Sequence, residues 1–109
     1  MPVTETTDSF LFLQVAENPY VILKYHTDEC GEICKKFIPI FQEFSDDPAF
    51  KHVVFLTINA DHNPSAKKHI LEKKQPVLAV YYKGCLLDSR HANSKEGIET
   101  LLTELLSKS

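Results

Sequence analysis

The sequence predicts an α/β fold, in which a mixed and mostly parallel β-sheet is flanked by helices on both faces. Segments with helical periodicity alternate with short apolar segments along most of the chain. This order is typical of parallel strands joined by right-handed crossovers. The clearest strand, residues 52–58, is a continuous apolar run, which suits a strand covered on both faces. Lys83-Gly84 predicts a tight turn, and hence an antiparallel hairpin at one edge of the sheet.

The predicted elements follow one another without an internal repeat or a linker. A weak strand signal near residues 2–5 precedes a helix over residues 7–17, which Asn18-Pro19 ends. The next predicted elements are a strand at 20–25, a helix at 32–44, the strand at 52–58, a helix from 64 to about 73, strands at 76–82 and 85–89, and a last amphipathic helix. Asn93 and Glu96 have the spacing of a capping box for that last helix. The whole chain, residues 1–109, is therefore expected to form a single domain.

The composition is that of a globular protein and excludes several classes of function. Of the 109 residues, 43% are hydrophobic and 25% are charged, which does not fit a disordered chain. The formal net charge of −3 gives no electrostatic argument for nucleic-acid binding. We find no stretch apolar enough to span a membrane. The polar start of the sequence does not resemble a secretory signal, so we expect a cytoplasmic protein.

Two of the three cysteines, Cys30 and Cys34, are close enough to act together. Cys30 follows the predicted strand at 20–25 and precedes the predicted helix at 32–44. The start of a helix stabilises a thiolate, which is the reactive form of cysteine. Cys34 lies one helical turn further on, so both sulfur atoms can face the same way and form a disulfide. The alternative is that both are small buried apolar side chains.

Residues 21–44 (VILKYHTDECGEICKKFIPIFQEF) resemble the active-site strand and helix of the thioredoxins. In that family a Trp-Cys-Gly-Pro-Cys-Lys motif is followed by a proline five residues after the second cysteine, and Cys34, Lys35 and Pro39 reproduce this second half. The resemblance extends over nearly the whole chain. It includes the central strand and loop at residues 55–64, the cis-proline position at 75–77, the edge turn at 83–84 and the last loop at 92–95.

The resemblance implies the thioredoxin fold and a thiol–disulfide oxidoreductase. It implies that Cys30 attacks a disulfide and that Cys34 resolves the mixed disulfide. Pro76, with Gln75 and His91, is implied to bind substrate. No bound cofactor is implied. The implied partners are disulfide-bearing protein or small-thiol substrates and a thioredoxin-type reductase, with no nucleic acid and no membrane, and the protein is expected to be a monomer.

Four departures from the family pattern bear on this function. Three residues instead of two separate the cysteines, and none of the three is a proline. Glu29 stands in the place of the tryptophan, and the acidic residues around Cys30 oppose a lowered thiol pKa. Lys24 stands where many thioredoxins keep a buried carboxylate. Its amine could point toward the cysteines and favour a thiolate, or it could extend to solvent.

Two alternatives to the oxidoreductase remain open at this point. The first is a redox-inactive thioredoxin-fold module, which would bind an extended partner segment near Pro76. The second is a copper or zinc site, formed by Cys30, Cys34 and either His26 or His91. The third cysteine, Cys85, follows the edge turn. We expect it to be a packing residue at the end of the sheet opposite the cysteine pair.

Overall fold

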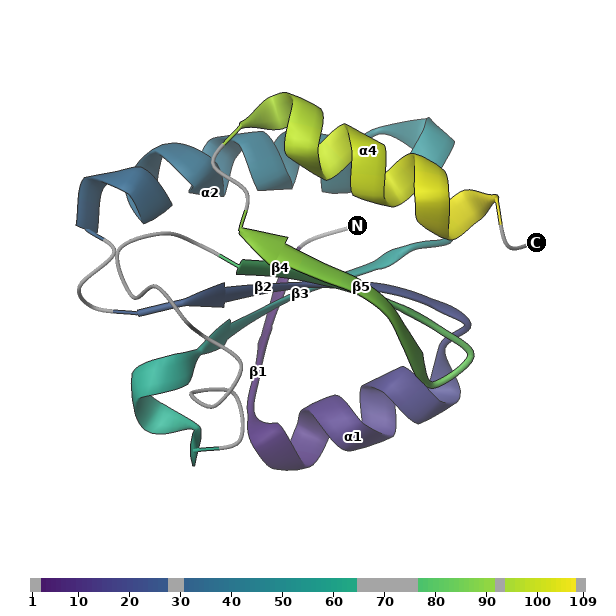
Figure 1. Cartoon of the computed structure of the whole chain (residues 1–109), viewed down its shortest axis with the longest axis horizontal. Coiled ribbons are helices and arrows are strands. Elements are labelled where there is room, and N and C mark those ends of the chain that lie inside the picture. The colour runs from purple at the N-terminus through teal and green to yellow at the C-terminus, as the bar shows by residue number, and fades with distance from the viewer. Residues whose placement is uncertain (1–2, 28–30, 65–76, 92–93, 108–109) are drawn as a thin grey trace.

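Five strands form one mixed β-sheet in the computed structural model, which describes residues 3–27, 31–64, 77–91 and 94–107 (Figure 1). The strands are β1 (Thr4–Thr6), β2 (Tyr20–His26), β3 (Val54–Asn59), β4 (Val77–Tyr82) and β5 (Cys85–His91), in the spatial order β1-β3-β2-β4-β5. Strand β3 pairs in parallel with β1 and β2, whereas β4 is antiparallel to β2 and β5. Only β4 therefore runs against the other strands, which confirms the mixed, mostly parallel sheet with its edge hairpin.

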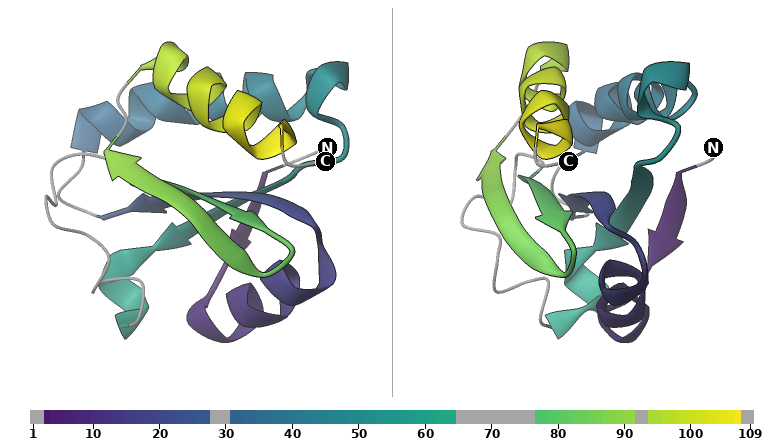
Figure 2. Two further views of the ribbon diagram at one scale, coloured as in Figure 1. Left: turned by 45° about the vertical axis from the view of Figure 1, so that its right-hand side comes forward. Right: turned by 90° about the vertical axis from the view of Figure 1, so that its right-hand side faces the viewer.

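Helices cover both faces of this sheet (Figures 1 and 2). Helices α2 (Gly31–Ser45) and α4 (Lys95–Leu106) lie on one face, and α1 (Asp8–Glu17) lies on the other. The bounds of α1 and α2 agree with the predicted ones to within one residue. The helix predicted from residue 64 to about 73 falls almost entirely outside the described residues. In the part of the chain that is described, no helix is long and apolar enough to cross a lipid bilayer.

The side chains of β2 alternate between two apolar cores. Ile22 points to the face covered by α2 and α4, and packs in a core with Phe41 and Leu101. Val21, Leu23 and Tyr25 point to the other face and pack against α1. Since both faces are covered, nearly every residue of β2 is buried, which explains why the run is apolar apart from Lys24.

The strand predicted at residues 52–58 begins two residues later than expected. A short 3₁₀ turn at Pro48–Phe50 precedes it, and the backbone N–H of Val53 donates a hydrogen bond to the carbonyl of Phe50 at 3.0 Å. His52 and Val53 therefore belong to the turn, although Val53 is fully buried in the core. An apolar run indicates burial, and burial alone does not distinguish a strand from a packed turn.

Pro39 lies inside α2, as predicted, and the helix continues through it. Proline removes one backbone hydrogen bond and crowds the preceding turn. Phe37 and Phe41, on either side of Pro39, are buried against the sheet, while Pro39 itself is exposed. Packing on both sides of the proline thus holds the two halves of the helix in place. The kink that the sequence predicts at this residue stays a prediction.

Ser94 caps the last helix, and the prediction of Asn93 as the cap is wrong by one residue. The Ser94 hydroxyl accepts a hydrogen bond from the backbone N–H of Gly97 at 3.3 Å. At the other end of the chain, the Thr7 hydroxyl accepts a hydrogen bond from the N–H of Phe10 at 3.4 Å. Both caps satisfy N–H groups that have no partner within their own helix.

Replacing Ser94 with alanine is expected to lower the free energy of unfolding by about 1 kcal/mol, because the N–H of Gly97 loses its acceptor. Urea denaturation measures this change. Thr103→Ala, at an exposed position inside the same helix, is the control and should leave stability equal or slightly higher, since alanine favours helix. Equal stability of Ser94→Ala and wild type would show that the cap does not hold in solution.

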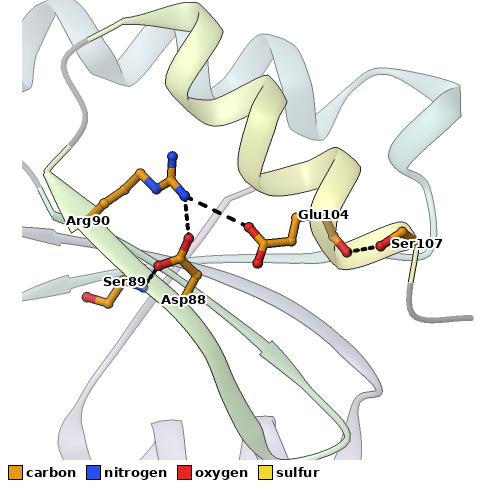
Figure 3. Close-up of polar contacts among 5 residues, drawn as sticks. All are labelled: Asp88, Ser89, Arg90, Glu104 and Ser107. Atoms are coloured by element: carbon orange, nitrogen blue, oxygen red, sulfur yellow. Dashed lines mark hydrogen bonds and ion pairs between the residues drawn. The ribbon is translucent and has the colours of Figure 1, made fainter.

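A charged cluster connects the edge strand β5 to α4 (Figure 3). The Arg90 guanidinium donates a hydrogen bond to Asp88, and its Nη2 lies 4.0 Å from Glu104 Oε2. The hydrogen bond from Arg90 holds the pKa of the Asp88 carboxyl below its ordinary value, and the pKa of Arg90 is raised by the same partner. Because the cluster is open to solvent, its ion pairs contribute little to stability.

Candidate functional site

The candidate site lies at the end of the sheet where β2 stops and α2 starts. Strand β2 ends at His26 and α2 begins at Gly31. The helix therefore directs its first N–H groups and its positive dipole end toward this end of the sheet. The predicted attacking residue, Cys30, falls outside the described residues. Cys34 lies in the first turn of α2, and the description extends only to its backbone.

Gly31 gives the start of α2 a backbone conformation that other residues rarely adopt. Its φ angle is +54°, in the left-handed region that favours glycine. Apart from its chain neighbours and the nearby backbone of its own helix, no described atom lies within 4 Å of the position that a Cβ would occupy, so the constraint is conformational and not steric. Gly31 directly follows Cys30 in the sequence. A special backbone turn thus stands between the two cysteines, in the segment that carries the additional residue.

The first turn of α2 carries one acid and one base on its exposed side. Glu32 Oε1 lies 3.8 Å from Lys35 Nζ, and both side chains are mostly exposed. An exposed pair at this spacing is weak. Glu32 lies between the two cysteines in the sequence, and Lys35 offsets only part of its negative charge.

The sheet register brings other predicted residues to the same edge. Val77, the first residue of β4, pairs with Tyr25 near the end of β2 and with His91 at the end of β5. Pro76 and Gln75 immediately precede Val77, but both fall outside the described residues. For His91, only the backbone is described. The structure therefore places the start of β4 between the end of β2 and the end of β5. The predicted substrate-binding side chains fall outside what it describes.

Lys24 is buried in the core beneath α2, so the alternative in which it extends to solvent is wrong, and the alternative in which its amine points toward the cysteines stays a prediction. Only 4% of its surface is exposed. Its Nζ lies 5.9 Å from the ring centre of Phe37 and 5.6 Å from that of Phe41, both on α2. Burial lowers the pKa of the ammonium group from 10.5 to about 8. At neutral pH the lysine is still mostly protonated, and it places a positive charge under the helix that carries Cys34.

The sequence did not indicate which residues surround Lys24. Glu5, Thr57 and Lys24 lie in register on three adjacent strands, and they line one cavity together with residues of α2. No motif connects these positions. Only the pairing of β1 with β3, and of β3 with β2, brings them together.

The described residues hold no group of three or more His, Cys, Asp and Glu side chains that could bind a metal ion. His26 Nε2 lies 3.7 Å from Glu5 Oε2 at the rim of the sheet. Because Cys30 is outside the described residues, the copper or zinc alternative stays a prediction.

Cys85 is exposed, so its predicted packing role is wrong. It pairs with Tyr82 at the end of the sheet opposite His91, as its place after the edge turn predicted.

Comparison with known proteins identifies the class to which this fold and site belong. The family model described as Thioredoxin matches residues 2–104. The chain therefore belongs to the thioredoxin family. No curated protein matches the sequence.

Solved thioredoxin structures agree with the fold at low sequence identity. Thioredoxin f from spinach chloroplast superposes with a TM-score of 0.82 at 17% identity, covering 95% of this chain and 93% of that one. Mitochondrial thioredoxin 3 from Saccharomyces cerevisiae superposes with a TM-score of 0.80 at 17% sequence identity, with 94% of each chain covered. Plasmodium falciparum thioredoxin gives 0.79 at 20%, covering 94% of this chain and 97% of that one. At these identities the likeness shows the fold alone.

Proposed function

We propose that the protein is a thiol–disulfide oxidoreductase of thioredoxin type, in which Cys30 is the attacking residue and Cys34 the resolving residue. The observation that carries the proposal is the position of Cys34 in the first turn of α2, directly after the junction with β2, in a member of the thioredoxin family. A cysteine pair at the start of a helix is where a thiolate is best stabilised.

The reaction consists of two exchanges that balance electrons and protons. The Cys30 thiolate attacks one sulfur of a substrate disulfide, and the other substrate sulfur leaves as a thiolate and takes a proton. The Cys34 thiolate then attacks Cys30 Sγ, which releases the second substrate thiol and leaves a Cys30–Cys34 disulfide. The substrate has gained two electrons. An external dithiol reductase must return two electrons to the protein, and we propose a thioredoxin-type reductase in that role.

Lys24 supports the first exchange through its charge. The family pattern has a carboxylate at this position, whereas here a buried ammonium group lies against Phe37 and Phe41 of α2. A positive charge in a poorly solvated interior favours a nearby thiolate over a thiol. It therefore opposes the effect of the acidic residues that precede and follow Cys30 in the sequence.

The substrate segment would bind beside the cysteines, against Pro76, Gln75 and His91. The register supports this arrangement, since Val77 and His91 are paired at the edge where β2 ends. We propose that an extended segment of a disulfide-bearing protein binds at this end of the sheet through backbone hydrogen bonds, in the manner of a strand. We further propose that the protein acts as a monomer in the cytoplasm.

An insulin-reduction assay with dithiothreitol tests the proposal. The wild-type protein is expected to accelerate precipitation of the insulin B chain well above the rate with dithiothreitol alone. No acceleration by a folded protein would contradict the oxidoreductase and leave the redox-inactive binding module in its place.

A further inference from the structure

A cavity of about 330 Å³ lies between α2 and the β1–β3–β2 part of the sheet. One row of paired residues contributes to it. Glu5 on β1 pairs with Thr57 on β3, which pairs in turn with Lys24 on β2. Residues paired in this way point to the same face of a sheet. Val3, Ile38 and Phe41 add apolar surface to the lining.

Two hydrogen-bond donors in this cavity have no acceptor among the described residues. The Lys24 side chain is buried and makes no hydrogen bond or ion pair within that part of the chain; its contacts there are with two aromatic rings. The Thr57 Oγ1 atom is buried and has no hydrogen-bond partner in the described structure. Buried polar groups are nearly always paired. An unpaired ammonium group is especially unfavourable, and a ligand that pairs it recovers much of that energy.

The polar neighbours of the cavity do not supply the missing acceptor. The Glu5 carboxylate lies 3.7 Å from His26 Nε2, and its side chain is 70% exposed. The Gln42 side-chain amide donates to Ser45 Oγ at 3.0 Å and to Asp46 Oδ1 at 3.2 Å. The acceptor of this amide is its oxygen, and no hydrogen bond joins that oxygen to Thr57 Oγ1 in the described structure.

We propose that this cavity binds a small monocarboxylic acid, whose carboxylate accepts hydrogen bonds from Lys24 Nζ and Thr57 Oγ1. A carboxylate has two oxygens and about four acceptor positions, so it can pair both donors at once. Its short hydrocarbon chain packs against Val3, Ile38 and Phe41. A hydrogen bond to a charged group contributes more than a neutral one, and burial strengthens it further. The site does not depend on the dithiol reaction.

Titration of the ¹⁵N-labelled protein with butyrate, followed by NMR chemical shifts, tests the site. Saturable shifts are expected for residues that line the cavity. Butyramide has the same shape without the charge, and it should produce no saturable shift over the same concentrations. If butyrate gives no saturable shift, or if butyramide binds equally well, the proposal is wrong.

Three variants test the assigned contacts. Lys24→Met keeps the length of the side chain and removes its charge, and it should weaken butyrate binding by about tenfold or more. Thr57→Val keeps the shape and removes the hydroxyl, and it should weaken binding by about threefold to tenfold. The control Lys51→Met changes an exposed lysine and should bind as wild type does. Unchanged affinity in Lys24→Met or Thr57→Val, with melting curves that show folded protein, overturns the proposal.

The pH dependence separates Lys24 from the other ionisable groups that face the cavity. Among the described residues these are Glu5 on β1 and His26 on β2, since Gln42 on α2 and Thr57 on β3 do not ionise. Butyrate binding should persist from pH 6 to 7 and weaken as Lys24 loses its proton above pH 8. Loss of binding that follows only the titration of a histidine would contradict the assignment to Lys24.

Discussion

Replacing Cys30 with serine is expected to reduce the catalysed rate of disulfide reduction by more than about a hundredfold, to the rate of dithiothreitol alone. A serine hydroxyl is not ionised at neutral pH and cannot attack a disulfide. The substitution should affect activity and leave stability unchanged, because it replaces one sulfur atom by oxygen in the segment that joins β2 to α2. The insulin assay measures the rate, and urea denaturation confirms that the variant is folded.

Cys34→Ser is expected to fail at a different step. Its Cys30 thiolate can still attack, but no resolving thiolate follows, so a mixed disulfide with the substrate accumulates. Mass spectrometry of the protein mixed with a disulfide-bearing peptide should detect the adduct in this variant and not in Cys30→Ser. Cys85→Ser is the matched control, since Cys85 is exposed at the opposite end of the sheet, and it should keep full activity. Full activity in Cys30→Ser, or an adduct on Cys85, would refute the assigned roles.

Lys24→Met is expected to stabilise the protein by about 2 kcal/mol at pH 7. The pKa of Lys24 falls from 10.5 to about 8 because the ammonium group is buried. At about 1.4 kcal/mol per pH unit, this shift corresponds to roughly 3 kcal/mol of destabilisation. Methionine fills a similar volume without a charge. Loss of the contacts with Phe37 and Phe41 offsets about 1 kcal/mol of the gain.

The difference in the free energy of unfolding between Lys24→Met and wild type should decrease as the pH rises. Below about pH 8 the lysine is protonated in both the folded and the unfolded state, so the buried charge destabilises the folded wild type to its full extent. Between pH 8 and 10.5 the unfolded chain holds the proton and the folded chain does not, so the stability of the wild type rises with pH relative to the variant. The free energies of unfolding of the two proteins should therefore be nearly equal by pH 10.

Urea denaturation of both proteins at pH 7 and at pH 10 measures this effect. Burial and the neighbouring Tyr81 hydroxyl raise the pKa of Tyr25, which destabilises the folded state at high pH. That contribution is common to both proteins and cancels in the comparison. Lys51→Met, which changes an exposed lysine, should show no such dependence on pH. If the difference in the free energy of unfolding between Lys24→Met and wild type is the same at pH 7 and pH 10, Lys24 is not buried as a charged group.

The sequence predicted the order of elements well, because the apolar pattern and the turn residues carry that information directly. β2 reads as a buried run since helices cover both of its faces. The prediction was less accurate at the ends of elements. Val53 is as buried as a strand residue but belongs to a turn, and Ser94 caps α4 in place of its neighbour. Such details depend on individual hydrogen bonds, which a pattern of residue types does not specify.

The candidate site was predictable in part. The place of Cys34 in the first turn of a helix follows from local sequence and is confirmed. The sequence left two directions open for Lys24, toward the cysteines or out to solvent, because a lysine side chain is long enough to reach solvent from many core positions. The row formed by Glu5, Thr57 and Lys24 could not be predicted. It brings together three distant segments, and a shift of one residue in either pairing would turn a side chain to the opposite face.

The most direct test of the central claim is a redox titration of the Cys30 and Cys34 pair. The purified protein is equilibrated at defined potentials, its free thiols are alkylated, and the peptide that spans both cysteines is weighed. We expect reversible closure of an intramolecular disulfide at a potential of roughly −270 to −200 mV, the range of thioredoxins and glutaredoxins. If no such disulfide forms at any potential, the three residues between the cysteines prevent closure, and the protein is not a thiol–disulfide oxidoreductase of this type.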